Sequence, residues 1–175
     1  AELASFDNIV VMGMGEPLHN YDAIIRALTI VNAGWGLGFG ARRITLSTCG
    51  LVGGIRRLAA LNWPQLKLAV SLNAADDSAR SALMPVNRRH DLATLKEALQ
   101  RYPLARGNVL LIEYVLIQGV NDSDEDAHRL ALFLKDLPAR LNLIAYNPRH
   151  ESPYAAPTEA EVSRFHQALV AQKVF

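Results

Sequence analysis

A carboxylate preceded by a glycine stands where a buried strand is predicted to end. Gly15 and Glu16 come shortly after the apolar run IVVM at residues 9–12, and Pro17 fixes the turn behind them. A run of β-branched residues without polar alternation is typical of a strand covered on both faces, as in a parallel sheet. The loop at the carboxyl end of such a strand is where α/β folds place their sites. Glu16 is therefore a candidate site residue.

Three further strand ends carry hydrogen-bonding side chains. The second predicted strand ends in STCG from residue 47, the third in SLN from residue 71, and the fifth in NP from residue 147. In a parallel α/β sheet these ends converge on one edge, so we expect one acid with several hydroxyl and amide groups around a single pocket. Each of these residues alone is better explained as turn or helix-capping chemistry. Their coincidence at four strand ends favours a site.

Strands that alternate with helices are predicted to position these residues. Apolar runs predict strands near residues 8–13, 43–48, 66–72, 108–117 and 140–146. Each is followed by a segment of helical period, near 21–33, 51–62, 76–83 with 91–102, 123–136 and 158–172. Ser123 with Asp126 and Thr158 with Glu161 have the spacing of capping boxes, and Asp91 is placed to cap a helix. The alternation predicts an α/β fold with a parallel sheet and right-handed crossovers.

Composition excludes several classes of function. The 175 residues are 50% apolar, which suffices for one compact domain with a sizeable core. Eighteen basic and 17 acidic residues give a net charge of +1, so no overall field attracts nucleic acid or anionic membrane. No apolar run approaches the length that spans a bilayer, and no signal segment is recognised. The single cysteine, Cys49, excludes an internal disulfide and favours a reducing compartment. We therefore expect a cytoplasmic protein without a membrane partner.

Other motifs predict less. GMGEPL supplies only the first two glycines of a dinucleotide fingerprint, and no Walker A lysine follows it. The five histidines lack the paired spacing of a zinc site on a helix. Arginine doublets at 42–43, 56–57 and 88–89 have the charge to contact RNA phosphate, although most such doublets are solvated surface.

Several motifs together resemble one family. The segments are VVMGMGEPLHNYD, GARRITLSTCGLV, LAVSLNAADDSARSALMPVNRRHDL, IEYVLIQGVNDS, and NLIAYNP with SPY, in this order. They resemble the radical S-adenosylmethionine (SAM) methyltransferases of the RlmN/Cfr type over essentially the whole chain. The resemblance implies a partial (β/α) barrel of the radical SAM type, with about five parallel strands, outer helices, and SAM across the carboxyl ends of the strands.

The resemblance places SAM contacts on the strand ends described above. Gly15 and Glu16 match the pair that meets the methionine ammonium, for which a carboxylate is a suitable acceptor. Ser47 matches a contact to the ribose or the carboxylate, and Asn147 matches a contact near the adenine.

The third strand end departs from the family pattern. Ser71, Leu72 and Asn73 match the family's Ser-Leu-His, with asparagine in place of histidine. Asparagine donates and accepts hydrogen bonds but does not titrate near neutrality, which argues against a proton-linked role at this position.

The resemblance also implies groups that this chain does not carry. The family binds three irons of a 4Fe–4S cluster through a C-x3-C-x2-C loop that precedes the segment matched here, and its methyl-carrying cysteine lies beyond the position of Phe175. We therefore expect residues 1–175 to be a single core-domain fragment with no catalytic or metal-binding residue of its own. We expect the isolated chain to be inactive, and its first strand to form an exposed edge that favours homo-oligomers.

The implied parent is an enzyme that methylates adenine in RNA. The RlmN type acts at C2 in 23S rRNA and also on tRNA, and the Cfr type acts at C8; we expect C2. The parent requires SAM, the 4Fe–4S cluster and an electron donor such as flavodoxin. Two alternatives stay open: a non-catalytic module that keeps the SAM pocket as a binding surface, and an ordinary barrel enzyme that uses Glu16 and Glu113 as an acid–base pair.

Overall fold

The computed structural model, which describes residues 6–174, has one five-stranded parallel sheet. The strands pair in chain order: β1 (Ile9–Val11), β2 (Ile44–Thr48), β3 (Lys67–Ser71), β4 (Leu110–Leu116) and β5 (Ala139–Ala145). Each strand begins and ends within two residues of its predicted range. The predicted α/β class and its parallel strands are confirmed.

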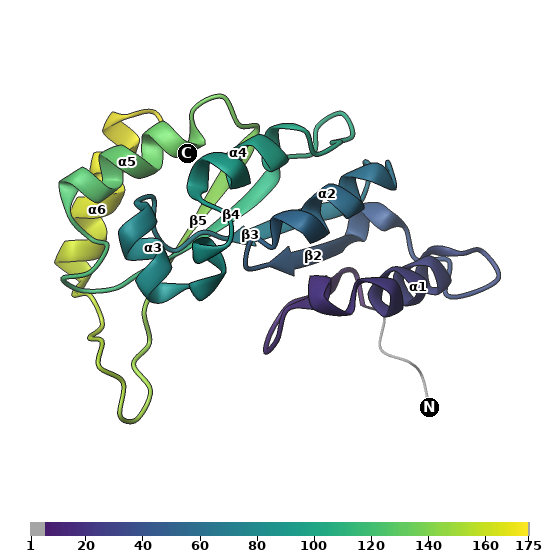
Figure 1. Ribbon diagram of the computed structural model, residues 1–175, viewed down its shortest axis with the longest axis horizontal. Coiled ribbons are helices and arrows are strands. Elements are labelled where there is room, and N and C mark those ends of the chain that lie inside the picture. The colour runs from purple at the N-terminus through teal and green to yellow at the C-terminus, as the bar shows by residue number, and fades with distance from the viewer. Residues whose placement is uncertain (1–5, 175) are drawn as a thin grey trace.

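Six helices connect and follow these strands (Figure 1). They are α1 (Tyr21–Asn32), α2 (Val52–Ala60), α3 (Asp77–Leu83), α4 (Leu92–Gln100), α5 (Asp124–Leu134) and α6 (Glu159–Ala171). Ser123 and Thr158 form the predicted capping boxes, and Asp91 accepts a hydrogen bond from the Thr94 N–H. No helix among residues 6–174 is long and apolar enough to cross a membrane.

Short 3-10 helices, which the periodicity did not predict, flank the regular elements. Two of them, Pro17–Asn20 and Pro85–Arg88, begin with a proline near the carboxyl ends of strands, and Ala41–Arg43 leads into β2. Segments of three or four residues are too short to show an apolar period. The proline fixes the backbone angle of the first helical turn.

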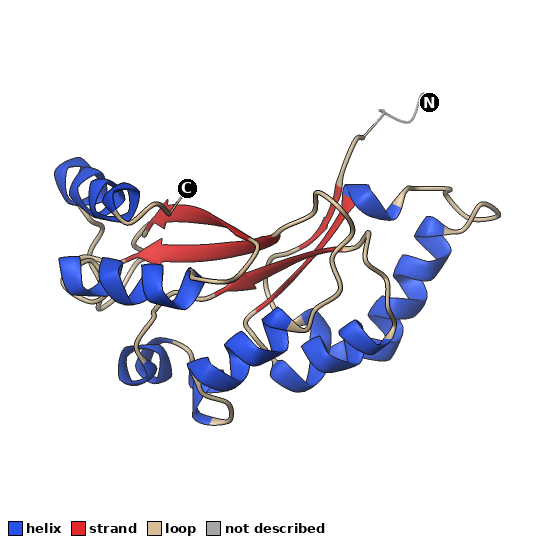
Figure 2. Ribbon diagram, turned by 90° about the horizontal axis from the view of Figure 1, so that it is seen from above, coloured by secondary structure: helices blue, strands red, loops and turns tan. Residues whose placement is uncertain are grey.

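The helices pack on one side of the sheet and leave the other side open (Figure 2). In β4 the buried side chains alternate with partly exposed ones, so that Leu110, Ile112, Tyr114 and Leu116 belong to the core beneath the helices. The strand β1 was predicted to be covered on both faces, and that prediction is wrong: Val10 is 59% exposed. The reason is that β1 is an edge strand whose second face has no helix.

Candidate functional site

The carboxyl ends of β1, β2 and β3 surround a cavity of about 240 Å³. Five of the predicted site residues line it: Gly15, Glu16, Ser47, Ser71 and Asn73. The same walls include Cys49 and Met84. Residues that lie far apart in the sequence therefore meet at one edge, because parallel strands in chain order bring their carboxyl ends together.

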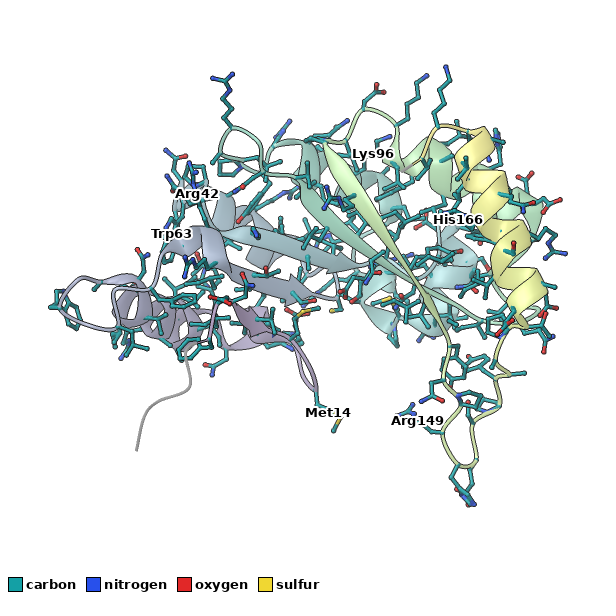
Figure 3. All side chains as sticks on the ribbon, turned by 180° about the vertical axis from the view of Figure 1, so that it is seen from behind. Met14, Arg42, Trp63, Lys96, Arg149 and His166 are labelled. Atoms are coloured by element: carbon teal, nitrogen blue, oxygen red, sulfur yellow. The ribbon has the colours of Figure 1, made fainter. Side chains whose placement is uncertain are left out.

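Two predicted site residues do not line this cavity. The Leu72 side chain is fully buried in the core, and its N–H donates to the Glu113 carbonyl at 2.8 Å. Asn147 is exposed in the loop after β5, and β4 separates β5 from β3 in the sheet. That loop, with Arg149, and the loop carrying Met14 extend from the same side of the molecule (Figure 3).

Glu16 is held in place by backbone N–H groups. Its Oε1 accepts from the Leu18 N–H at 2.9 Å, and its Oε2 accepts from the Cys49 N–H at 2.7 Å. Gly15 has a φ of +102°, which favours glycine immediately before the acid. Each carboxylate oxygen has two lone pairs, so Glu16 can still accept a hydrogen bond from a ligand ammonium. The side chain thus joins the loops after β1 and β2 and lines the cavity.

Arg80 lies behind the cavity and contacts two of the strand ends, a role that the sequence analysis missed. It is 1% exposed, and its Nε donates to the Leu72 carbonyl at 3.0 Å. Its Nη2 donates to the Cys49 carbonyl at 2.8 Å, and its Nη1 donates to Asn87 Oδ1 at 2.8 Å. None of the ion pairs formed by residues 6–174 includes Arg80. Burial lowers the pKa of Arg80, yet an arginine in a protein stays protonated.

Asn73 connects β3 to β4 where the family pattern has a histidine. Its Oδ1 accepts from the Val115 N–H at 3.1 Å. Asn121, which is fully buried and was also missed, donates through Nδ2 to the Asn73 carbonyl at 2.6 Å. Asn73 has a φ of +60°, a left-handed conformation in which asparagine is enriched. The Asn73 amide therefore connects two strands by a hydrogen bond, a structural role that does not require a group that titrates.

The Cys49 thiol is half-buried beside Glu16. Burial, followed by the hydrogen bond to the Glu16 carboxylate and its charge, raises the pKa of Cys49 to about 12. The sulfur is therefore a thiol at neutral pH, which is a poor nucleophile and a poor metal ligand. Among residues 6–174 no group of three His, Cys, Asp or Glu side chains could hold a metal ion.

These side chains fit one of the two implied cofactors. A single protonated thiol does not fit a 4Fe–4S cluster, which cysteine thiolates hold. The carboxylate of Glu16 and the hydroxyl groups of Ser47 and Ser71 do fit the ammonium and the oxygen atoms of SAM.

Glu113 does not line the cavity that contains Glu16. It lies opposite Ser71 in the pairing of β3 and β4, and Ser71 Oγ is 3.5 Å from Glu113 Oε2, a long separation for a hydrogen bond. Both oxygens of Glu16 accept backbone hydrogen bonds. The geometry gives no support to an acid–base pair made of these two carboxylates.

Comparison with known proteins identifies the class. The family model of the Radical SAM superfamily matches residues 1–131, and the chain belongs to this superfamily. A solved structure of a radical SAM methyltransferase from Sphaerobacter thermophilus matches with a TM-score of 0.90 at 47% identity, over 97% of this chain and 50% of that chain. A domain of pyruvate-formate lyase-activating enzyme from Bacteroides vulgatus shares the fold, with a TM-score of 0.68 at 20% identity.

Within the superfamily the chain is similar to proteins named RlmN. It is 52% identical over 174 residues to the probable dual-specificity RNA methyltransferase RlmN 3 of Opitutus terrae. It is 48% identical over 162 residues to the dual-specificity RNA methyltransferase RlmN of Sorangium cellulosum. The matches cover 99% and 93% of this chain but 46% and 42% of those relatives, so the chain spans less than half of their length. The resemblance to the RlmN type is confirmed.

Proposed function

We propose that residues 1–175 form a single SAM-binding core domain within a longer enzyme that methylates adenine at C2, in 23S rRNA and in tRNA. One observation carries the proposal: a carboxylate and two serine hydroxyls from three neighbouring strands share one cavity in a chain of the radical SAM superfamily. The names of the relatives support RNA as the substrate class. The choice of adenine, of C2 and of 23S rRNA follows the sequence resemblance. Such substrates place the activity in the cytoplasm.

In this proposal the chain binds and orients SAM, which supplies the methyl group. The Glu16 carboxylate accepts hydrogen bonds from the ligand ammonium, and Gly15 gives the backbone turn that places it. The hydroxyl groups of Ser47 and Ser71 bind ribose or carboxylate oxygens. The loop that begins near Asn147 lies toward the adenine.

The remaining groups belong to the longer enzyme in this proposal. Because the chain has one cysteine and spans less than half of its relatives, we assign the 4Fe–4S cluster and an electron donor such as flavodoxin to the whole protein. The isolated chain is expected to be inactive. Nothing in the geometry favours a non-catalytic module or an ordinary barrel enzyme over this function.

The position of one arginine doublet supports contact with RNA beside the cavity. The doublet at 56–57 is occupied in ion pairs with acidic side chains, and the doublet at 42–43 lies at the amino end of β2 (Figure 3, Arg42). The exposed doublet at 88–89 lies at the end of the short helix Pro85–Arg88. That helix comes directly after Met84, which lines the cavity. Neither arginine of this doublet forms an ion pair with a described residue.

Binding of SAM tests the proposed site. Ser47→Ala and Ser71→Ala should each weaken SAM binding about fivefold, because each removes one hydrogen bond of roughly 1 kcal/mol. Ser163→Ala, which changes an exposed serine on α6, should leave the affinity unchanged. Calorimetry or NMR titration measures the three affinities. A wild-type chain that does not bind SAM would contradict the proposal.

Binding of RNA tests the arginine doublet separately. Arg88→Ala with Arg89→Ala should weaken binding of an adenine-containing RNA oligonucleotide and lower the salt dependence of the affinity by about two charges. Arg42→Ala with Arg43→Ala is the matched control, because it removes the same charge from the amino end of β2. Equal losses in both double variants would contradict the assignment.

A further inference from the structure

Three side chains connect four successive strand ends at the site. Glu16 connects the loops after β1 and β2, Arg80 connects the loop after β2 to the end of β3, and Asn73 connects β3 to β4. Glu16 and Arg80 meet at one residue, Cys49. The Cys49 N–H donates to the Glu16 carboxylate at 2.7 Å, and the Cys49 carbonyl accepts from Arg80 at 2.8 Å.

The burial of Arg80 needs an explanation beyond folding. Removing a charge from water is unfavourable unless the charge is paired or fully hydrogen-bonded, and an apolar side chain of similar volume often stabilises a core equally well. Arg80 is 1% exposed, and its acceptors are backbone carbonyls and the amide of Asn87 rather than a carboxylate. Its planar guanidinium reaches the ends of two strands at once, which a lysine ammonium does not reproduce.

We propose that Arg80 is a positioning residue for the amino-acid end of SAM, an inference that rests on the proposed function. Arg80 itself does not line the cavity. It fixes the Cys49 carbonyl, and through the same residue it fixes the N–H group that orients the Glu16 carboxylate. The residue after Cys49 leaves room for the Arg80 guanidinium. Gly50 has a φ of +93°, and a Cβ atom there would lie 2.9 Å from Arg80 Nη2.

The test compares SAM with a ligand that lacks its amino-acid end. The ligand 5′-methylthioadenosine keeps the adenosine and the methyl-bearing sulfur of SAM, as a neutral thioether in place of the sulfonium, and has no ammonium and no carboxylate. Arg80→Lys should weaken SAM binding about tenfold, or about 1.4 kcal/mol, while the affinity for 5′-methylthioadenosine stays within about twofold. Arg101→Lys is the matched control, because the Arg101 side chain is 76% exposed and pairs with Glu97. It should change neither affinity.

The experiment distinguishes a failure of this inference from a failure of the proposed function. If Arg80→Lys changes both affinities by the same factor, or changes neither, Arg80 only supports the fold and the inference is wrong. If the wild-type chain does not bind SAM, the proposed function falls and the inference falls with it.

Wild-type protein gives an answer even if Arg80→Lys does not fold. The buried Arg80 Nε–H and the Cys49 N–H should give exchange-protected NMR signals, because both donate to protein acceptors. SAM should shift both signals, and 5′-methylthioadenosine should shift neither. Binding of SAM without a shift of the Arg80 signal would overturn the inference.

Discussion

The Cys49 thiol allows a chemical test of the site geometry in the unmodified chain. Burial and the neighbouring Glu16 carboxylate raise the pKa of Cys49 to about 12. At pH 8 about a quarter of unperturbed thiols, with a pKa of about 8.5, are thiolates. At a pKa of about 12 the thiolate fraction is about one in ten thousand. A more basic thiolate is also more nucleophilic, so alkylation should slow by roughly one and a half to two orders of magnitude rather than by the full ratio.

Intact-mass spectrometry of iodoacetamide labelling measures this rate. The same chain in concentrated urea provides the rate of an unperturbed thiol. In the folded chain the rate should rise tenfold per pH unit from pH 7 to about pH 10 without a plateau. Glu16→Gln should accelerate labelling because it removes a charge and a carboxylate acceptor that raise the thiol pKa, whereas Glu125→Gln, at an exposed side chain on α5, should not. Equal rates in the folded and unfolded chains, or a plateau below pH 9, would refute the assigned surroundings of Cys49.

The capping box of α6 should weaken in acid. Hydrogen bonds from Gln118 and Thr158 lower the pKa of Glu161, so its stabilisation is present above its unfolded pKa of about 4.3 and is lost as the pH falls through its lower folded pKa. Glu161→Gln should therefore lower the unfolding temperature at pH 7 and have little effect at pH 2; equal effects at both values would contradict this. Val10 is 59% exposed on an edge strand, so the chain should self-associate and Val10→Lys should shift its sedimentation toward the monomer. Unchanged sedimentation would exclude this edge. Anaerobic reconstitution should give no stoichiometric 4Fe–4S cluster and no 5′-deoxyadenosine from SAM, by iron and sulfide analysis and chromatography; a stoichiometric cluster would contradict the expected inactivity.

Regular elements were predictable because their signals are local. Apolar runs, separated by segments of helical period, predict the strands. Ser123, Thr158 and Asp91 mark the starts of three helices. The prediction that β1 is covered on both faces failed because the composition of a short strand does not reveal that helices cover only one face of the sheet. Among residues 6–174 β1 pairs with β2 alone, so it forms the edge of the sheet that the family resemblance implied.

The site was predictable only in part. Parallel strands bring their carboxyl ends together, which is why the sequence predicts that Glu16, Ser47 and Ser71 line one cavity, as they do. Arg80 was missed because it lies in a short polar helix, DSARSAL, where an arginine ordinarily faces solvent. Its acceptor on Cys49 is 31 residues away, and no local pattern records such a contact.

The two connections at Cys49 affect how variants of Glu16 are interpreted. Glu16→Gln removes the charge that a ligand ammonium would meet, and it also replaces one acceptor oxygen by an NH₂ group that faces a backbone N–H. Weaker SAM binding by this variant alone therefore does not separate a ligand contact from a displaced loop. The pair Glu16→Gln and Arg80→Lys separates them, because side chains that act through one shared residue have non-additive effects. If Arg80 acts by holding the Cys49 backbone, the double variant should lose less SAM affinity than the sum of the single losses in free energy. Strict additivity would mean that Arg80 and Glu16 act on the ligand independently.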